Sequence, residues 1–135
     1  MVNTNLSTIV VGYLPTPEGS AALDLAKTWA AANEARLVVV NTGRNGDYSH
    51  PNFASAQDID AVDHELSASG ISHEVHQPTD GKPAAEAILD AATHSSADLI
   101  VIGLRRRSPV GKLITGSTAQ QVLLDADCPV LTVKS

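Results

Sequence analysis

The chain has 135 residues, of which 43% are hydrophobic, 18% are charged and only 3% are aromatic, and its formal net charge is −6. This length fits a single domain over residues 1–135, and the apolar fraction excludes a disordered chain. The acidic balance argues against a general nucleic-acid-binding protein, which would usually be basic. Because aromatic residues are scarce, the core must consist of Val, Ile, Leu and Ala, which favours a parallel sheet covered by helices.

The sequence carries no sign of export or of membrane insertion. Residues Met1–Thr8 lack the positive charge and the long apolar stretch of a signal peptide. The longest apolar runs are too short to cross a bilayer. The single cysteine, Cys128, excludes an internal disulfide and fits a reducing compartment. We therefore expect a cytoplasmic protein that does not contact a membrane.

Five short apolar runs predict strands, and helical patterns separate them. The expected strands are Thr8–Gly12, Leu37–Asn41, Ser72–His76, Leu99–Gly103 and Val130–Val133. Between them, apolar residues recur at the spacing of one helix face. The residues of these four faces are, in chain order, Ala22, Leu25, Ala26 and Trp29; Ile59, Val62 and Leu66; Ala84, Ile88 and Ala91; and Ala119, Val122, Leu123 and Ala126.

Residues that favour helix ends flank these helical patterns. Ser55 followed by Asp58 is a capping-box pattern that predicts the start of the second helix. Gly70 suits the end of the same helix. Pro83 predicts the start of the third helix, and Pro129 the end of the fourth.

The strict alternation of strands and helices predicts a parallel sheet with right-handed crossovers. The run Ser72–His76 alternates polar and apolar residues, as an edge strand does, whereas Leu37–Val40 and Leu99–Ile102 are wholly apolar and belong inside. We predict a five-stranded doubly wound α/β fold with strand order 3-2-1-4-5 and two helices on each face. In this order the first and fourth strands meet at the topological switch point, where ligands bind outside the carboxyl ends.

The loop after the fourth strand concentrates the positive charge of this acidic chain. Of nine basic residues, four lie in it: Arg105, Arg106, Arg107 and Lys112. A helix then begins after Gly116, and its free N–H groups, with the Ser117 hydroxyl, favour a phosphate. We expect the loop Gly103–Ser117 to hold an anion. The alternative is a solvated surface loop in which Ser117 only caps the helix.

This loop resembles the signature of the universal stress protein family, in which a glycine, two residues, a second glycine and nine residues precede Gly-Ser or Gly-Thr. The matching positions are Gly103, Arg106, Gly116 and Ser117. The resemblance extends over nearly the whole chain. It includes the helical pattern at 20–26, the strand at 97–103 and the ending at 128–131.

The resemblance implies a flavodoxin-like fold and a homodimer joined along the fifth strand. In nucleotide-binding members the signature loop carries the ribose and phosphates of ATP or AMP, sometimes with Mg²⁺. By this resemblance Gly103, Gly116 and Ser117 belong to the nucleotide site, and Thr118 could donate its N–H. Two positions depart from the pattern. Arg106 replaces the second glycine, and Leu14 stands where nucleotide-binding members carry an acidic residue near the adenine.

Three functions remain open at this point. The first is an adenine-nucleotide-binding stress-response regulatory protein in which Arg106 itself binds a phosphate. The second is a dimeric interaction module of the same fold that binds no nucleotide, which the departures at Arg106 and Leu14 favour. The third, a slow ATP hydrolase, ranks last because only Glu18 offers an acid near the phosphates. The sequence shows no catalytic residue and no metal-ligand set, so we expect binding rather than catalysis.

Overall fold

Strands and helices alternate along the chain, as the sequence predicts. The computed structural model describes residues 6–43, 48–104 and 116–135. The strands in these ranges are β1 (Thr8–Gly12), β2 (Arg36–Val40), β3 (His73–His76), β4 (Leu99–Leu104) and β5 (Val130–Lys134). The helices are α1 (Pro17–Asn33), α2 (Ala56–Ala68), α3 (Ala84–Ser95) and α4 (Ser117–Asp125).

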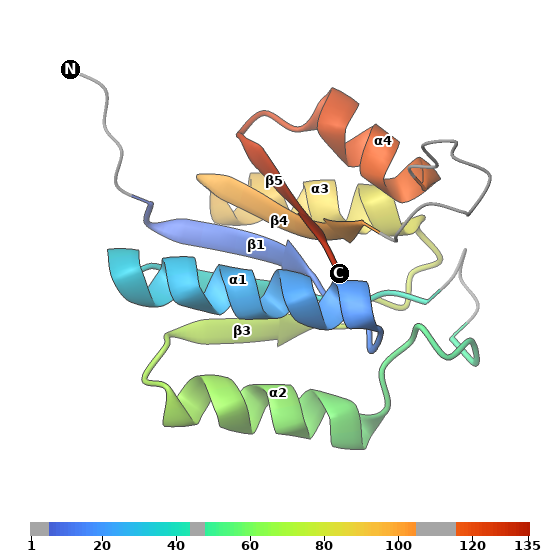
Figure 1. Cartoon of the computed structure of the whole chain (residues 1–135). Helices are drawn as coiled ribbons and strands as arrows, with labels where there is room; N and C mark the ends of the chain where they lie inside the picture. The colour runs from blue at the N-terminus through green and yellow to red at the C-terminus, as the bar shows by residue number, and fades with distance from the viewer. Residues whose placement is uncertain (1–5, 44–47, 105–115) are drawn as a thin grey trace.

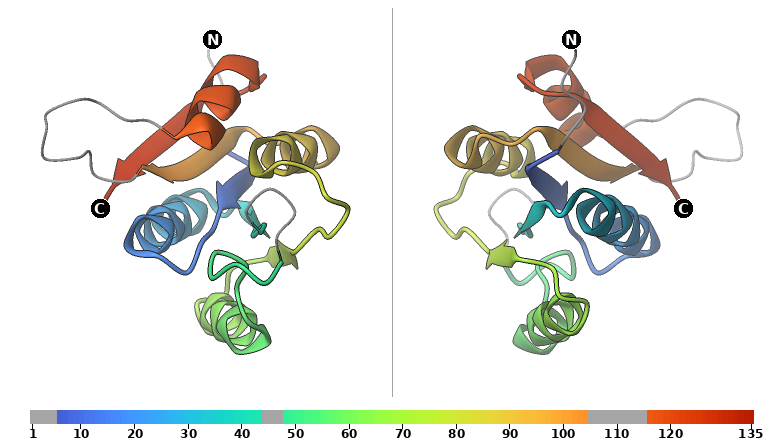
Figure 2. Two further views of the ribbon diagram at one scale, coloured as in Figure 1. Left: turned by 90° about the vertical axis from the view of Figure 1, so that its right-hand side faces the viewer. Right: turned by 90° about the vertical axis from the view of Figure 1, so that its left-hand side faces the viewer.

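The five strands form one parallel sheet in the order β3-β2-β1-β4-β5 (Figure 1), which confirms the predicted fold. Helices α1 and α2 cover one face of the sheet, and α3 and α4 cover the other (Figure 2). Side chains alternate between the two faces because successive residues of a strand point in opposite directions. Those facing α1 and α2 are Ile9, Val11, Leu37, Val39 and Val101; those facing α3 and α4 are Val10, Val38, Val40, Ile100 and Ile102.

The helix ends follow local side-chain chemistry. The Ser55 hydroxyl accepts from the Asp58 N–H at 3.0 Å, and the Asp58 carboxylate accepts from the Ser55 N–H at 3.3 Å, so the predicted capping box is confirmed. Gly70 follows α2 with a φ of 71°, the left-handed conformation that glycine adopts readily. Pro83 directly precedes α3. Among the described residues, no helix is long and apolar enough to cross a bilayer.

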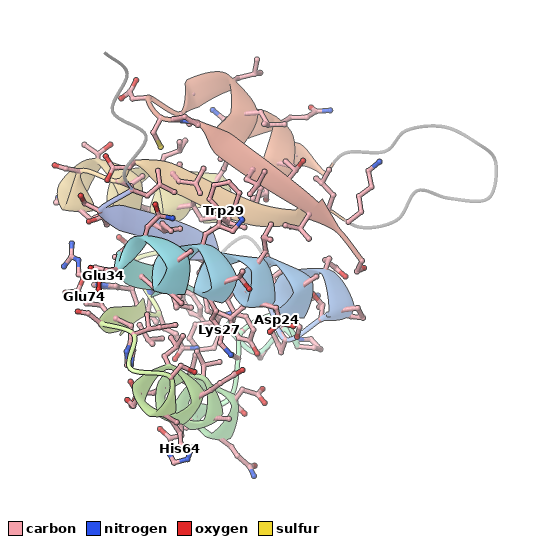
Figure 3. The ribbon with its side chains drawn as sticks, turned by 60° about the vertical axis from the view of Figure 1, so that its left-hand side comes forward. Asp24, Lys27, Trp29, Glu34, His64 and Glu74 are labelled. Atoms are coloured by element: carbon pink, nitrogen blue, oxygen red, sulfur yellow. The ribbon has the colours of Figure 1, made fainter. Side chains whose placement is uncertain are left out.

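The buried face of α1 differs in part from the predicted one. Ala22 and Ala26 are buried as expected, but Leu25 is only half-buried and 40% of Trp29 is exposed. The side chains that complete the face are Gly19, Leu23 and Ala30. These mostly small residues let the helix approach the sheet closely, which leaves no room for an indole beneath it. Figure 3 shows Lys27 on the side of α1 toward α2 and Trp29 on the opposite side.

The two edges of the sheet differ in character. Strand β3 has four residues of alternating exposure, and its exposed positions carry Glu74 and His76, as a protected edge strand does. The edge prediction for this strand is therefore confirmed. Strand β5 is the other edge, and Leu131 and Val133 are half-buried against the core on the α1 side.

The side chain of His73 ties the start of β3 to α2. Its Nδ1 lies 2.7 Å from the Ile71 carbonyl oxygen, and its Nε2 lies 2.7 Å from the Asp63 carboxylate. Both partners are acceptors, so only the imidazolium, which has two N–H donors, satisfies both. The carbonyl of Ile71 and then the Asp63 carboxylate raise the pKa of His73 above its ordinary 6.5, although burial opposes the shift.

This histidine should make stability depend on pH. Because its pKa is raised in the folded state, its contribution is complete below pH 6.5 and is lost as the pH rises through the folded-state pKa. We expect His73→Gln to lower the free energy of unfolding by about 1 kcal/mol at about pH 5.5 and by less at about pH 9. Urea denaturation at both pH values measures the difference. His64→Gln is the control, because His64 is exposed on α2 and points away from the body (Figure 3). Equal costs for His73→Gln at both pH values would contradict the prediction.

Candidate functional site

The predicted switch point lies where the carboxyl ends of β1 and β4 meet. Since all five strands are parallel, these ends share one edge of the sheet, and the left view of Figure 2 looks onto it. Strand β1 leads into the loop before α1, and β4 ends at Leu104. Helix α4 begins after Gly116. The β1–α1 loop, the end of β4 and the start of α4 therefore lie at the edge where this fold class predicts a ligand crevice.

Gly103 has a packing role at this edge. A Cβ atom built on it would lie 2.2 Å from the Glu18 carbonyl oxygen and 2.6 Å from the Glu18 carbonyl carbon. Such contacts with backbone cannot be relieved by turning a side chain, so any larger residue would push the first turn of α1 away from β4. Packing alone therefore requires glycine at position 103, whether or not a ligand binds nearby.

Gly19 makes a second close approach, which the sequence reasoning missed. A Cβ atom there would lie 2.0 Å from the Leu14 carbonyl oxygen. The same segment is tightened by the Thr16 hydroxyl, which caps α1 by accepting from the Gly19 N–H at 3.1 Å. A glycine in the first turn of a helix is unfavourable by propensity, and this was the available signal. Leu14, which stands where an acidic residue was expected, is half-buried in this turn.

The first backbone N–H groups of α4 have no acceptor within the helix. Its cap residue, Gly116, has no side chain to accept from them, and the first helical hydrogen bond runs from the Gln120 N–H to the Gly116 oxygen at 3.2 Å. The three preceding N–H groups therefore have no acceptor within the helix. Ser117 is exposed and Thr118 is half-buried, so the structure brings Gly116, Ser117 and Thr118 together at this end.

Gly116 contrasts with the two glycines of the first crossover. No described atom lies within 4 Å of a Cβ built on it, and its φ of −61° is open to any residue. Neither packing nor backbone conformation within the described residues therefore requires glycine here. Glycine is among the residues that occur readily at a helix N-cap, and it also allows another group to approach the backbone closely.

The basic residues of the loop are not among those that the structure describes. Arg106, which was assigned to the site, lies outside the described residues, and so do Arg105, Arg107 and Lys112. Their roles stay predictions. Within residues 6–43, 48–104 and 116–135, no group of three His, Cys, Asp or Glu side chains is placed to hold a metal ion.

Directly after β2 lies a buried amide side chain, that of Asn41, which was not predicted from the sequence. Asn41 is fully buried, and it donates to the Tyr13 carbonyl oxygen at 2.9 Å. The Tyr13 ring is also buried, and burial raises the pKa of its hydroxyl, with a smaller effect from the charges of Asp58 and Glu65. A polar residue directly after an apolar strand, at the ligand-binding edge, was the signal that could have identified Asn41.

A separate cavity of about 650 Å³ lies between α3 and the outer strands β2 and β3. Its charged groups pair with one another: Arg36 with Glu74 at 3.2 Å, and Lys82 with Asp90 at 2.6 Å. The Asp90 carboxylate raises the pKa of Lys82. Because these charges are already matched, and because β2, β3 and α3 line the cavity and not the end of β4 or the start of α4, it does not extend the candidate anion site.

Comparison with known proteins identifies close relatives over almost the full length. The chain matches the model of the universal stress protein family over residues 5–134. It is 40% identical over 126 residues to a universal stress protein of Mycolicibacterium smegmatis, an alignment that covers 93% of this chain and 96% of that protein.

Solved structures show the same fold. A universal stress protein from Archaeoglobus fulgidus aligns with a TM-score of 0.71 and 32% identity, covering 95% of this chain and 98% of that one. A structure of the universal stress protein from Archaeoglobus fulgidus in complex with dAMP aligns with a TM-score of 0.63 and 26% identity, with the same coverage of both chains.

The two signature glycines should respond differently to the same substitution. Gly103→Ala should lower the free energy of unfolding by about 1–3 kcal/mol, because the added methyl group meets the Glu18 backbone. Gly116→Ala should cost less than about 1 kcal/mol, because the space is open and only a helix cap changes. Urea denaturation of both variants measures this. Equal costs would show that Gly103 is not held by packing.

Proposed function

Since the chain belongs to the universal stress protein family, we propose that it is an adenine-nucleotide-binding regulatory protein whose switch-point crevice holds ATP or AMP. The observation that carries the proposal is the start of α4, where donors without a side-chain cap follow Gly116, and no described atom lies within 4 Å of a Cβ built on this glycine. The dAMP bound by a related Archaeoglobus fulgidus protein supports an adenine nucleotide as the ligand class.

In this proposal the phosphates lie at the N-terminus of α4. The backbone N–H groups and the positive end of the helix dipole favour an anion there, and the Ser117 hydroxyl adds a further donor. Thr118 contributes its N–H, and Gly116 lets the phosphate approach the backbone. The guanidinium of Arg106 supplies a charge-assisted contact. Mg²⁺, where it accompanies ATP, is held mainly through phosphate oxygens and water, as is usual for this ion.

The base lies on the other side of the crevice, near the loop that starts at Tyr13. Gly103 contributes by letting α1 close against β4, so that the ribose has a defined wall. Occupancy of this site shifts a conformational or partner-binding equilibrium of a cytoplasmic protein, which is how a binding protein without a catalytic residue regulates.

Isothermal titration calorimetry with ATP and AMP tests the site. Arg106→Ala should weaken binding about ten- to a hundredfold, because a hydrogen bond to a charged group contributes about 1.5–3 kcal/mol. Ser117→Ala should cost about 1 kcal/mol, because the backbone donors remain. Arg36→Ala is the matched control: it also removes a guanidinium, but Arg36 begins β2 at the opposite edge of the sheet.

The outcomes separate the candidate functions. No heat with millimolar ATP or AMP would reject nucleotide binding, and the non-nucleotide interaction module, which Leu14 and Arg106 favour, would replace it. If Arg106→Ala binds ATP as well as the parent does, the arginine is a solvated charge and the proposed phosphate contact is wrong.

We also propose a homodimer joined along β5. The strand is an edge of the sheet, and its Leu131 and Val133 are only half-buried. Helix α1 contacts β5, and Trp29 lies with 40% exposure on the side of α1 away from α2 (Figure 3). An open apolar edge favours pairing with another chain, and a two-fold partner strand would satisfy its backbone groups.

A proline at the outward-facing position of β5 tests this dimer. The Ile100 N–H donates to the Pro129 oxygen, so in a parallel ladder the N–H of Leu131 faces β4 and that of Thr132 faces the open edge. Thr132→Pro should therefore remove the dimer and leave the fold intact. Light scattering at micromolar concentration should give twice the 14.0 kDa chain mass for the parent and the single mass for the variant. A monomeric parent, or a variant that stays dimeric, would reject this interface.

A further inference from the structure

A single buried amide joins three loops at the carboxyl edge of the sheet. Asn41, the residue after β2, is fully buried, and its Nδ2 donates to the carbonyl oxygens of Tyr13 and Asn52, both at 2.9 Å. Its Oδ1 accepts from the Ala54 N–H at 2.8 Å and from Gln77 Nε2 at 2.9 Å. An amide offers two donor hydrogens and two acceptor lone pairs, so every hydrogen-bonding position of this side chain is used.

The partners come from three different connections. Tyr13 follows β1, Asn52 and Ala54 precede α2, and Gln77 follows β3. Gln77 Nε2 also donates to the Ala54 oxygen at 2.9 Å, which closes the network on itself. Removing any one partner would leave one hydrogen-bonding position of the buried Asn41 side chain unused, which is unfavourable. The three connections are therefore held as one unit.

Two aromatic side chains strengthen the same unit. The Tyr48 hydroxyl accepts from the Gly81 N–H at 2.7 Å, which gives a second link between the segment before α2 and the loop after β3. The rings of Tyr48 and Phe53 meet edge to face with centroids 5.2 Å apart. With Tyr13 they place three of the four aromatic residues of the chain at this edge of the sheet.

The network fixes the path of the chain as it leaves β1. The Tyr13 N–H donates to the Val40 oxygen at 2.8 Å, and the Tyr13 oxygen accepts from Asn41, so both backbone groups of Tyr13 are used. The far end of the same loop is held by the close approach of Gly19 to the Leu14 carbonyl. The loop that bounds one side of the crevice therefore has little freedom to adjust to a ligand.

We infer that Asn41 is the positioning residue for the base-binding side of the nucleotide site, an inference that rests on the proposed function. Its amide holds the β1–α1 loop, beside which the proposed base lies, together with Asn52 and Ala54, and Gln77 donates to the same amide from the third loop. The phosphate side is built separately, from the N-terminus of α4. Disturbing Asn41 should therefore weaken recognition of the base and spare recognition of the phosphate.

Asn41→Asp is the discriminating variant, because it keeps the shape of the side chain and changes only its hydrogen bonding. Whether ionised or protonated, a carboxyl group supplies at most one of the two donors that Tyr13 and Asn52 require. The probes are AMP and ribose 5-phosphate, which share the ribose and phosphate and differ in the base. We expect the preference for AMP over ribose 5-phosphate to fall about tenfold or more, with the affinity for ribose 5-phosphate within about twofold of the parent.

Two further variants keep the test independent of folding and of charge. Asn33→Asp makes the same chemical change at the exposed end of α1 and should leave the preference for AMP unchanged. Gln77→Leu removes one bond to Asn41 and should lower the preference about fivefold, so it carries the test if Asn41→Asp does not fold. Circular dichroism establishes which variants fold.

The result distinguishes this inference from the function on which it rests. A parent that binds neither AMP nor ATP rejects both. A parent that binds AMP, together with folded Asn41 or Gln77 variants that keep the full preference over ribose 5-phosphate, rejects the positioning role alone. An equal loss of AMP and ribose 5-phosphate also rejects it, because Asn41 would then support the fold and not the base.

Discussion

The close backbone approach of the first turn of α1 to the end of β4 is the constraint on which this edge of the molecule depends. At Gly103 a Cβ would lie 2.2 Å from the Glu18 carbonyl oxygen, and at Gly19 one would lie 2.0 Å from that of Leu14. Both contacts are made with backbone, which cannot move aside as a side chain can. Gly103 lets the first turn of α1 pack against the end of β4, and Gly19 lets the β1–α1 loop fold closely against the same turn.

The two sides of this carboxyl edge of the sheet differ in chemistry. Toward β2 and β3, buried side-chain hydrogen bonds centred on Asn41 fix the connecting loops. Toward β5, the start of α4 has no side-chain cap and leaves its donors without helical acceptors. The first side is held together by internal hydrogen bonds, and the second offers the N-terminal end of a helix, which favours an anion. In a chain with a net charge of −6, local chemistry and not overall charge must supply the attraction for an anion.

The sequence predicted the strands to within a residue or so because a buried parallel strand is marked by a short apolar run, which can be recognised locally in the sequence. It also predicted the Ser55 cap and the exposed edge strand β3. It misplaced Trp29, because spacing on a helix shows which residues share a face and not how closely that face approaches the sheet. The candidate site could be predicted from the sequence only in part. The donors at Ser117 could be read from a glycine and a hydroxyl at a helix start, but the bonds of Asn41 join residues far apart in the chain, such as Tyr13 and Gln77.

The glycines of the signature also show why a motif and a site are not the same thing. Gly103 and Gly116 are both glycines of the sequence pattern, yet Gly103 is required by packing against Glu18, and a Cβ on Gly116 would meet no described atom within 4 Å. The same distinction applies to Asn41. An apolar residue in its place would remove the partners of the buried Tyr13 oxygen and Ala54 N–H and two further part-buried bonds, which would destabilise the surrounding loops. Because the network is satisfied only as a whole, the three loops can change position only together.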